Sequence, residues 1–124
     1  MEVILTHIVW KRILTSLVSL LLADVVWFRY SIQHVYPTFP QSNVVWGLVA
    51  WIALAIAISA GKPDSVKTAG LWGAVVGAIA YAVFNGTELA IRTDWSPSVA
   101  LVDTLWGIGN CSVSSVALYW LGKK

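Results

Sequence analysis

Three carboxylic acids, Asp24, Glu88 and Asp103, occur inside otherwise apolar stretches of the sequence. An ionisable side chain is costly to place in a membrane, so such groups usually face a protein interior or water rather than lipid. Carboxylates that lie close together raise one another's affinity for protons, and they can also hold a cation or a small ligand. The residue types therefore predict a small binding site or a proton or cation relay.

The same acids also fit a purely structural role, and we rank this interpretation of the polar groups ahead of a binding or relay function. Interhelical hydrogen bonds commonly hold membrane bundles together. Glu88 can pair with Arg92 or with Arg29, so that arginines neutralise the acids. Asp24 can cap a partner helix. The two interpretations differ in what surrounds the carboxylates.

Helical spacing predicts which side chains accompany the acids. Tyr81, Asn85, Glu88 and Arg92 share one face of a helix, and Asp103, Trp106 and Asn110 share another. Counted from the ends of their segments, the three acids fall within roughly 5–8 Å of one membrane face. We therefore expect a single polar cluster, and its candidate ligand-binding or proton-binding residues are Asp24, Asn85, Glu88, Asp103, Trp106, Trp27 and Tyr81.

The elements that must position these residues are four apolar segments. The chain has 124 residues, of which 58% are hydrophobic and only 11% are charged, too apolar for a small soluble domain. Each segment is close to the ~20 residues that cross a bilayer. The sequence predicts an all-α bundle of four transmembrane helices, at about residues 11–30, 43–60, 66–91 and 98–121, in one transmembrane domain, 1–124. The protein is expected to be a multi-pass integral membrane protein, with the host membrane left open.

The distribution of basic residues predicts the orientation of the bundle. Cationic loops are retained on the cytoplasmic side of a membrane. One face carries Lys11, Arg12, Lys62, Lys67, Lys123 and Lys124, and the other carries Arg29 and Arg92. Both termini are therefore expected to be cytoplasmic. Tryptophans near the segment ends are expected in the headgroup region: Trp10, Trp46, Trp72, Trp95 and Trp120.

Small residues on two helices predict close packing. Gly70, Gly73 and Gly77 give the third segment a flat face, which suits close helix contact, within the chain rather than between protomers. Ser112, Ser114 and Ser115 on the fourth segment are interpreted as packing residues that bond to their own backbone rather than as nucleophiles.

The sequence lacks the residues that several kinds of chemistry require. Cys111 is the single cysteine, and both histidines, His7 and His34, fall outside the predicted spans. We therefore assign no metal ligand and no catalytic residue, and the cofactor is left unknown. Lys11 and Lys67 lie at the very ends of their spans, so no lysine lies deep enough in the membrane for a retinal Schiff base, and no basic block suits nucleic acid.

Four stretches resemble a bacterial membrane-protein family, domain of unknown function 2177 (DUF2177). The family's motif close to YATYDxTN corresponds to residues 81–88 (YAVFNGTE), and its VDxxWG corresponds to residues 102–107 (VDTLWG). Its LDxxW is similar to residues 23–27 (ADVVW), and its GWP to residues 94–97 (DWSP). Asn85 and Glu88 stand where the family has Asp and Asn. The resemblance implies four membrane helices and the same polar residues, and it implies no reaction.

Three functional interpretations remain open. The leading one is a non-enzymatic membrane protein that binds a small ligand, proton or cation and joins a homo-oligomer or a larger membrane complex. The second is a structural accessory subunit or a lipid-organising protein without a ligand. The third is a lipid-modifying membrane enzyme that uses Asp24, Glu88 and Asp103 as acid and base, although no nucleophile or metal set accompanies them. Membrane lipids are expected partners in every case.

Overall fold

The computed structural model describes residues 2–31 and 44–122, with side chains at 9–30 and 45–122. Its helices are α1 (Glu2–Ser31), α2 (Val44–Ser59), α3 (Val66–Ile91) and α4 (Pro97–Gly122). The prediction of an all-α chain with four helices is confirmed. Three helices begin and end within about one residue of the predicted ranges, whereas α1 begins at Glu2 rather than near residue 11. Charged Lys11 and Arg12 end the apolar run but are good helix formers, so they do not end the helix.

Local sequence signals mark the starts of α3 and α4. Ser65 caps α3, because its hydroxyl accepts a hydrogen bond from the Thr68 backbone N–H while the Thr68 hydroxyl accepts one from the Ser65 N–H. Pro97 occupies the start of α4, and the Ser96 hydroxyl accepts from the backbone N–H of Val99. A short connection between these two helices makes them antiparallel neighbours.

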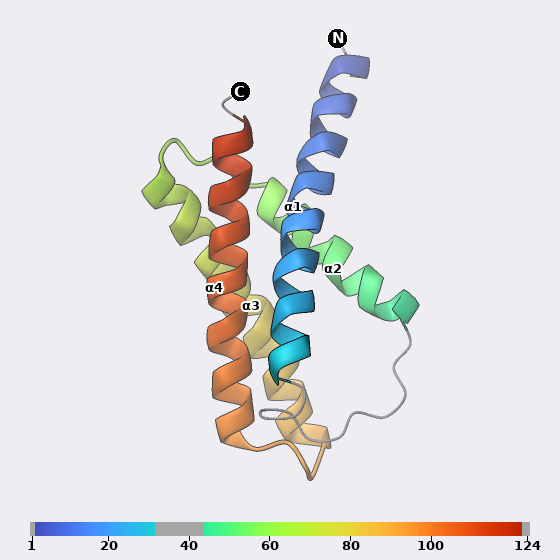
Figure 1. Cartoon of the computed structure of the whole chain (residues 1–124), viewed down its shortest axis with the longest axis vertical. Helices are drawn as coiled ribbons and strands as arrows, with labels where there is room; N and C mark the ends of the chain where they lie inside the picture. Colours follow the sequence, from blue (N-terminus) through green and yellow to red (C-terminus); the bar gives the residue numbers. More distant parts are fainter. Residues whose placement is uncertain (1, 32–43, 123–124) are drawn as a thin grey trace.

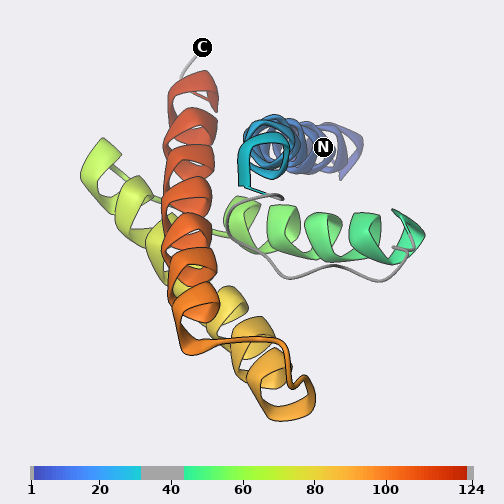
Figure 2. The same cartoon turned by 60° about the horizontal axis from the view of Figure 1, so that its bottom comes forward.

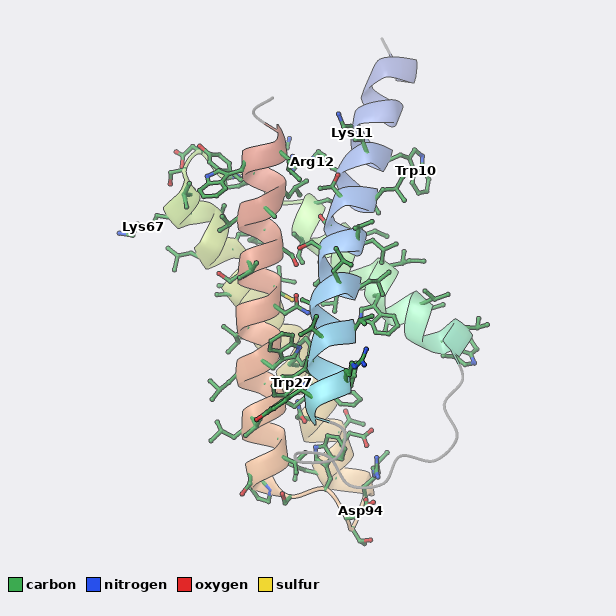
Figure 3. The ribbon with its side chains drawn as sticks, in the orientation of Figure 1. Trp10, Lys11, Arg12, Trp27, Lys67 and Asp94 are labelled. Atoms are coloured by element: carbon green, nitrogen blue, oxygen red, sulfur yellow. The ribbon has the colours of Figure 1, made fainter. Side chains whose placement is uncertain are left out.

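The helices form a bundle with both termini at one end. In Figure 1, α1 descends from the N-terminal end while α4 rises toward the C-terminus, and α3 crosses behind α4. Figure 2 shows α3 crossing α4 obliquely and α2 lying across α1 at a steep inclination. Lys11, Arg12 and Lys67 lie toward the end that holds the termini, and Asp94 lies at the opposite end (Figure 3). We call the former the terminal end.

Glycines on α3 allow its close approach to α4. A Cβ atom added at Gly77 would stand 2.5 Å from the backbone oxygen of Gly107, and one at Gly73 would collide with the backbone of Cys111. At Gly70 the same atom would meet the Ser112 hydroxyl at 3.4 Å. All three glycines therefore lie against α4 of the same chain, and α3 and α4 have the most extensive contact in the bundle.

The bundle buries several polar side chains and exposes many large apolar ones. Fully or nearly fully buried positions include polar residues, such as Ser16 and Ser114 at 0% exposure and Asp24 at 3%. Large apolar side chains lie outside on every helix, for example Leu22, Val45, Ile79 and Leu105. Such an exterior suits lipid, and the polar groups then find partners inside the protein.

Helix length and composition agree with a membrane location. Within the described residues, Val9–Tyr30 and Val66–Ile91 are long and apolar enough to cross a membrane. The apolar part of α2, Val45–Ser59, is shorter. The 26 residues of α4 equal the length of α3, but interior polar residues such as Asp103 and Asn110 lower its hydropathy. Those polar residues are buried, so the outer surface of α4 remains apolar.

Two side chains from other helices hold the C-terminal end of α2. Arg12 Nη2 donates hydrogen bonds to the carbonyl oxygens of Ser59 and Gly61, each at 3.1 Å. The indole N–H of Trp72 is 3.2 Å from the carbonyl oxygens of Ala57 and Ile58. The last carbonyls of a helix lack intrahelical partners, so these donors add hydrogen bonds where the backbone ladder of α2 ends.

We expect Arg12→Leu to lower the free energy of unfolding by about 1–2 kcal/mol, because the carbonyl oxygens of Ser59, the last residue of α2, and of Gly61 just beyond it lose a charged donor. Thermal unfolding in detergent measures the change. Lys11→Leu is the matched control, since Lys11 is an exposed neighbour on the same helix. Equal effects of the two substitutions would show that only the loss of charge matters.

Candidate functional site

The Asp24 carboxylate is the point at which α1, α2 and α4 meet through hydrogen bonds. Trp51 on α2 donates its indole N–H to Oδ2 at 2.6 Å. On α4, the Trp106 indole N–H donates to Oδ1 at 2.8 Å, and Asn110 Nδ2 donates to the same oxygen at 3.1 Å. We call Asp24 and these three donors the Asp24 centre. All three donors are neutral, so within the described residues no cation balances a carboxylate that is 3% exposed.

Helical geometry explains why α4 contributes two donors. Trp106 and Asn110 are four residues apart, so both side chains project from one face toward α1. The indole of Trp27, three residues after Asp24, stacks on that of Trp106 with ring centroids 4.7 Å apart and planes inclined by 8°. This stack fixes the orientation of Trp106 and covers the Asp24 centre on the side away from the terminal end.

A second polar group joins α3, α4 and the connection between them. Asn85 Nδ2 donates to Asp103 Oδ2 at 2.8 Å, and it also lies within hydrogen-bonding distance of Thr104 Oγ1 and of the Tyr81 carbonyl oxygen. The Trp95 indole N–H donates to Asn85 Oδ1 at 3.0 Å. Asn85, Asp103 and Trp95 are 3–5% exposed. We call these three residues the Asn85 centre.

The two centres lie at different depths. Asp103 precedes Trp106 and Asn110 by three and seven residues on α4, which places it roughly 4.5–10 Å farther from the terminal end than the donors to Asp24. The expected single cluster is thus distributed over two layers, with the stacked Trp27 and Trp106 between Asp24 and the α3–α4 connection. Helix crossing separates the layers, because α1 meets α4 while α3 supplies Asn85 from another direction.

Glu88 lies beside Arg92 rather than in either centre. Arg92 Nη1 is 3.3 Å from Glu88 Oε2, one helical turn away, and Nη2 is 2.8 Å from Asp94 Oδ2. The hydrogen bond from Arg92 lowers the pKa of Asp94 more than any other interaction does. The guanidinium also stands 5.0 Å from the ring centroid of Trp95. The structural interpretation of Glu88, a pairing with Arg92, thus describes the observed contact.

The remaining candidate residues border these centres. Trp27 takes part in the indole stack described above. Tyr81 packs its ring over Gly107 on α4, and its carbonyl oxygen accepts from Asn85. Gly107 has no side chain, so the aromatic ring can lie directly against the α4 backbone.

The candidate residues named from the sequence omitted Trp51, Trp95 and Asn110, although Asn110 was expected on the same helix face as Asp103 and Trp106. Trp95 was expected in the headgroup region and is instead 4% exposed, packed against Trp27 and Phe28; that expectation is wrong. Its position near a helix end resembles that of an interfacial tryptophan, and only the fold turns its ring inward. Trp51 lies in the middle of a charge-free helix, away from both ends, and this position was the available signal.

The interpretation of the α4 serines is also wrong for two of them. Ser114 Oγ contacts Ser19 Oγ on α1 at 3.0 Å and lies 3.4 Å from Asn110 Oδ1, and Ser112 Oγ donates to the Gly70 carbonyl oxygen on α3 at 3.0 Å. Their hydroxyls bond across helix interfaces because the glycine and serine positions bring the helices close enough. Within the part of the chain that the structure describes, no group of three metal-ligating side chains gathers.

These observations agree with a comparison against protein families. Residues 9–120 match the family described as predicted membrane protein, DUF2177. The chain belongs to this family. The match includes every residue of the Asp24 and Asn85 centres, so the DUF2177 region and the polar interior coincide. Comparisons with curated proteins and with solved structures gave no significant match.

Proposed function

We propose that this DUF2177 protein spans the membrane four times and that Asp24 is an intramembrane site for a proton or a small cation. One observation carries the second part. A carboxylate at 3% exposure has three neutral N–H donors and, among the described residues, no cationic partner. Burying an ionised carboxylate without a counter-charge is costly, and uptake of a proton or a cation removes that cost.

The donors allow both charge states of Asp24. An ionised carboxylate accepts all three N–H bonds. A carboxylic acid protonated at Oδ2 still accepts from Trp106 and Asn110 at Oδ1. The change of charge therefore requires rearrangement chiefly at Trp51, the donor to Oδ2. A binding site that exchanges its occupant needs such a limited rearrangement, whereas an Arg–carboxylate pair would hold one charge state.

Infrared spectroscopy of the protein in lipid tests this proposal. We expect a carboxylic-acid stretching band that grows as the pH is lowered and is missing in Asp24→Asn. A cation site predicts instead that Na⁺ or K⁺ shifts the carboxylate band of the parent protein at constant pH and leaves the variant unchanged. Asp94→Asn, at the exposed end of the molecule, is the control for non-specific carboxylate signals. A spectrum in which Asp24→Asn changes neither band contradicts the proposal.

A structural role is the second candidate, and the same contacts favour it. Three hydrogen bonds join α1 to α2 and α4 through one side chain, as expected for a group that locks a membrane bundle. An accessory subunit or lipid-organising protein would need no exchange at Asp24. In that case the Asp24 band stays constant over the whole pH range, and loss of the carboxylate affects stability alone.

The topology part of the proposal predicts that both termini are cytoplasmic. It is supported by the six-to-two division of basic residues and by the positions of Lys11, Arg12 and Lys67 near the terminal end. At 16 residues, α2 is only about 24 Å long, so its crossing requires local thinning of the ~30 Å hydrocarbon core. Reporter fusions at residues 1 and 124 should both report the cytoplasm. Reporters on opposite sides exclude four spans.

We also propose that the protein associates with lipids and with a further copy or another membrane subunit. Gly109 on α4 is exposed, and apart from its own stretch of helix no atom of the described residues lies within 4 Å of a Cβ added there. A helix of another chain can approach closely at such a position. Native mass spectrometry from detergent gives the oligomeric state.

A further inference from the structure

Polar groups between α1 and α4 form one hydrogen-bonded row that ends on Asp24. Ser19 Oγ lies 3.0 Å from Ser114 Oγ, and Ser114 Oγ lies 3.4 Å from Asn110 Oδ1. Asn110 Nδ2 then donates to Asp24 Oδ1 at 3.1 Å. With Ser19 as the first donor, every hydrogen bond in this row points toward the carboxylate.

The row leads from Asp24 toward the terminal end. Ser19 and Ser16 precede Asp24 on α1 by five and eight residues, roughly 7.5 and 12 Å along the helix. Ser16 is fully buried and donates to the carbonyl oxygen of Arg12 at 3.1 Å. From Asp24 the interhelical row thus extends to Ser19, and the buried Ser16 adds a further hydroxyl on α1 toward the terminal end.

Aromatic rings close the other direction. The stacked indoles of Trp27 and Trp106 lie next to Asp24 on the side away from the termini. Trp27 and Phe28 in turn pack against the buried ring of Trp95, and Phe84 meets Trp95 edge-on with ring centroids 6.0 Å apart. A transient water needs two to four polar partners, which the serine row offers and the aromatic layer offers only at its N–H groups.

We infer that Asp24 exchanges a proton with the side of the membrane that holds the termini, along Ser19 and Ser114 and past the amide of Asn110. This inference rests on the proposed function and specifies its ligand and its route. It is notable that Asp24 is nearer to the opposite end of α1, six residues before Tyr30 and fifteen after Val9. We therefore expect the proton to reach Asp24 from the terminal end, although the opposite membrane face is closer.

The contacts in the row favour a proton over a metal cation. Side-chain atoms that already touch at 3.0–3.4 Å leave no passage for a hydrated ion, whereas a proton moves between hydrogen-bonded groups and single waters. Uptake adds one proton to an Asp24 oxygen and removes its negative charge, and no other bond is made or broken. Asn110 acts as a positioning residue, since an amide does not readily pass on a proton, and a transient water beside it carries the proton from Ser114 to Asp24.

The titratable and charged groups around Asp24 are not placed to take up the proton in its stead. α1 packs on α2 and α4. α2 carries no titratable side chain, and on α4 Cys111 is close enough to interact electrostatically with Asp24, while Asp103 lies beyond the tryptophan layer. On α1 itself, Arg29 is exposed, and Arg12 directs its guanidinium to the carbonyls of α2 rather than into the serine row.

The test is a pH jump applied to one side of proteoliposomes whose protein orientation is known from a protease-sensitive tag at residue 124. Protonation of Asp24 is followed by the infrared carboxyl band and by the difference in tryptophan fluorescence between the parent and Asp24→Asn, because Trp51 and Trp106 bond to Asp24. We expect a fast response to a jump on the terminal side. Ser19→Ala and Ser114→Ala should each slow it about tenfold.

Ser112→Ala is the matched control, because Ser112 lies on the same helix but bonds to α3. It should leave the rate unchanged. Trp27→Leu should admit a response from the opposite side. Rates in Ser114→Ala that equal or exceed the parent rate, or a parent that responds fastest from the opposite side, overturn the route alone. A parent protein without any Asp24-dependent signal overturns the proposed function as well.

Discussion

Gly77→Leu is expected to separate α3 from α4 and to destabilise the protein by more than about 3 kcal/mol. An added Cβ would already stand 2.5 Å from the backbone oxygen of Gly107 and 2.9 Å from the Cα of Ile108. These are backbone atoms and cannot rotate aside, so the helices must move apart. Separation also removes the contacts of Tyr81 and Asn85 with α4. Denaturation of the purified protein in detergent, followed by circular dichroism, measures the loss.

Gly86→Leu is the control for this substitution. Gly86 lies on the same helix, is exposed, and has open space where the new side chain would stand. Leucine has a higher helix propensity than glycine, so this variant should be as stable as the parent or more stable by up to about 1 kcal/mol. Comparable losses in both variants, or a stable Gly77→Leu, show that the α3–α4 contact is not the one described.

Asp24→Ala is expected to lower the free energy of unfolding by about 3–5 kcal/mol. The substitution leaves the N–H groups of Trp51, Trp106 and Asn110 without their acceptor in a buried, largely apolar setting. The penalty for unsatisfied donors exceeds the gain from removing one buried charge, because three donors lose their partner at once. Tryptophan fluorescence during denaturation in mixed detergent micelles measures the change.

Two further variants separate the hydrogen bonds from the charge. Asp24→Asn keeps an oxygen for Trp106 and Asn110 and should lose much less stability than Asp24→Ala. Trp106→Phe combined with Asp24→Ala should cost less than the sum of the two single changes, since both remove the same bond. Additive effects, or an Asp24→Ala variant as stable as the parent, contradict the prediction that the hydrogen bonds to Asp24 stabilise the bundle.

The local elements of this protein could be predicted because their causes are local. Apolar runs bounded by glycine, proline and charged residues require helices, and the Ser65 and Pro97 positions mark two of their starts. The cost of burying Asp24 and Asp103 likewise follows from residue type and surroundings in the sequence, so both were candidates before their partners were known. The family resemblance, noticed at residues 23–27, 81–88 and 102–107, is confirmed by the match over residues 9–120.

The partners of the acids depended on the tertiary structure. Which donor reaches Asp24 is decided by how α2 crosses α1. The mid-helix position of Trp51 distinguishes it from an interfacial tryptophan but does not identify the group to which it bonds. Trp95 and the interfacial tryptophans have similar positions near helix ends, yet the fold buries Trp95 at 4% exposure and leaves Trp46 at 69%. The destination of an indole depends on its neighbours, not on its place along one helix.

The sequence by itself determined the helices, the membrane setting and the identity of the costly carboxylates, because each follows from periodicity, length and the free energy of burial. Only the tertiary structure decided that Asp24 and Asp103 occupy two centres instead of one and that Glu88 lies outside both. The glycine contacts of Gly73 and Gly77 fix the crossing of α3 and α4, and that crossing places Asn85 beside Asp103 and away from Asp24. Interhelical angles and offsets depend on the shapes of both surfaces at once, and helical spacing within one segment carries no information about them.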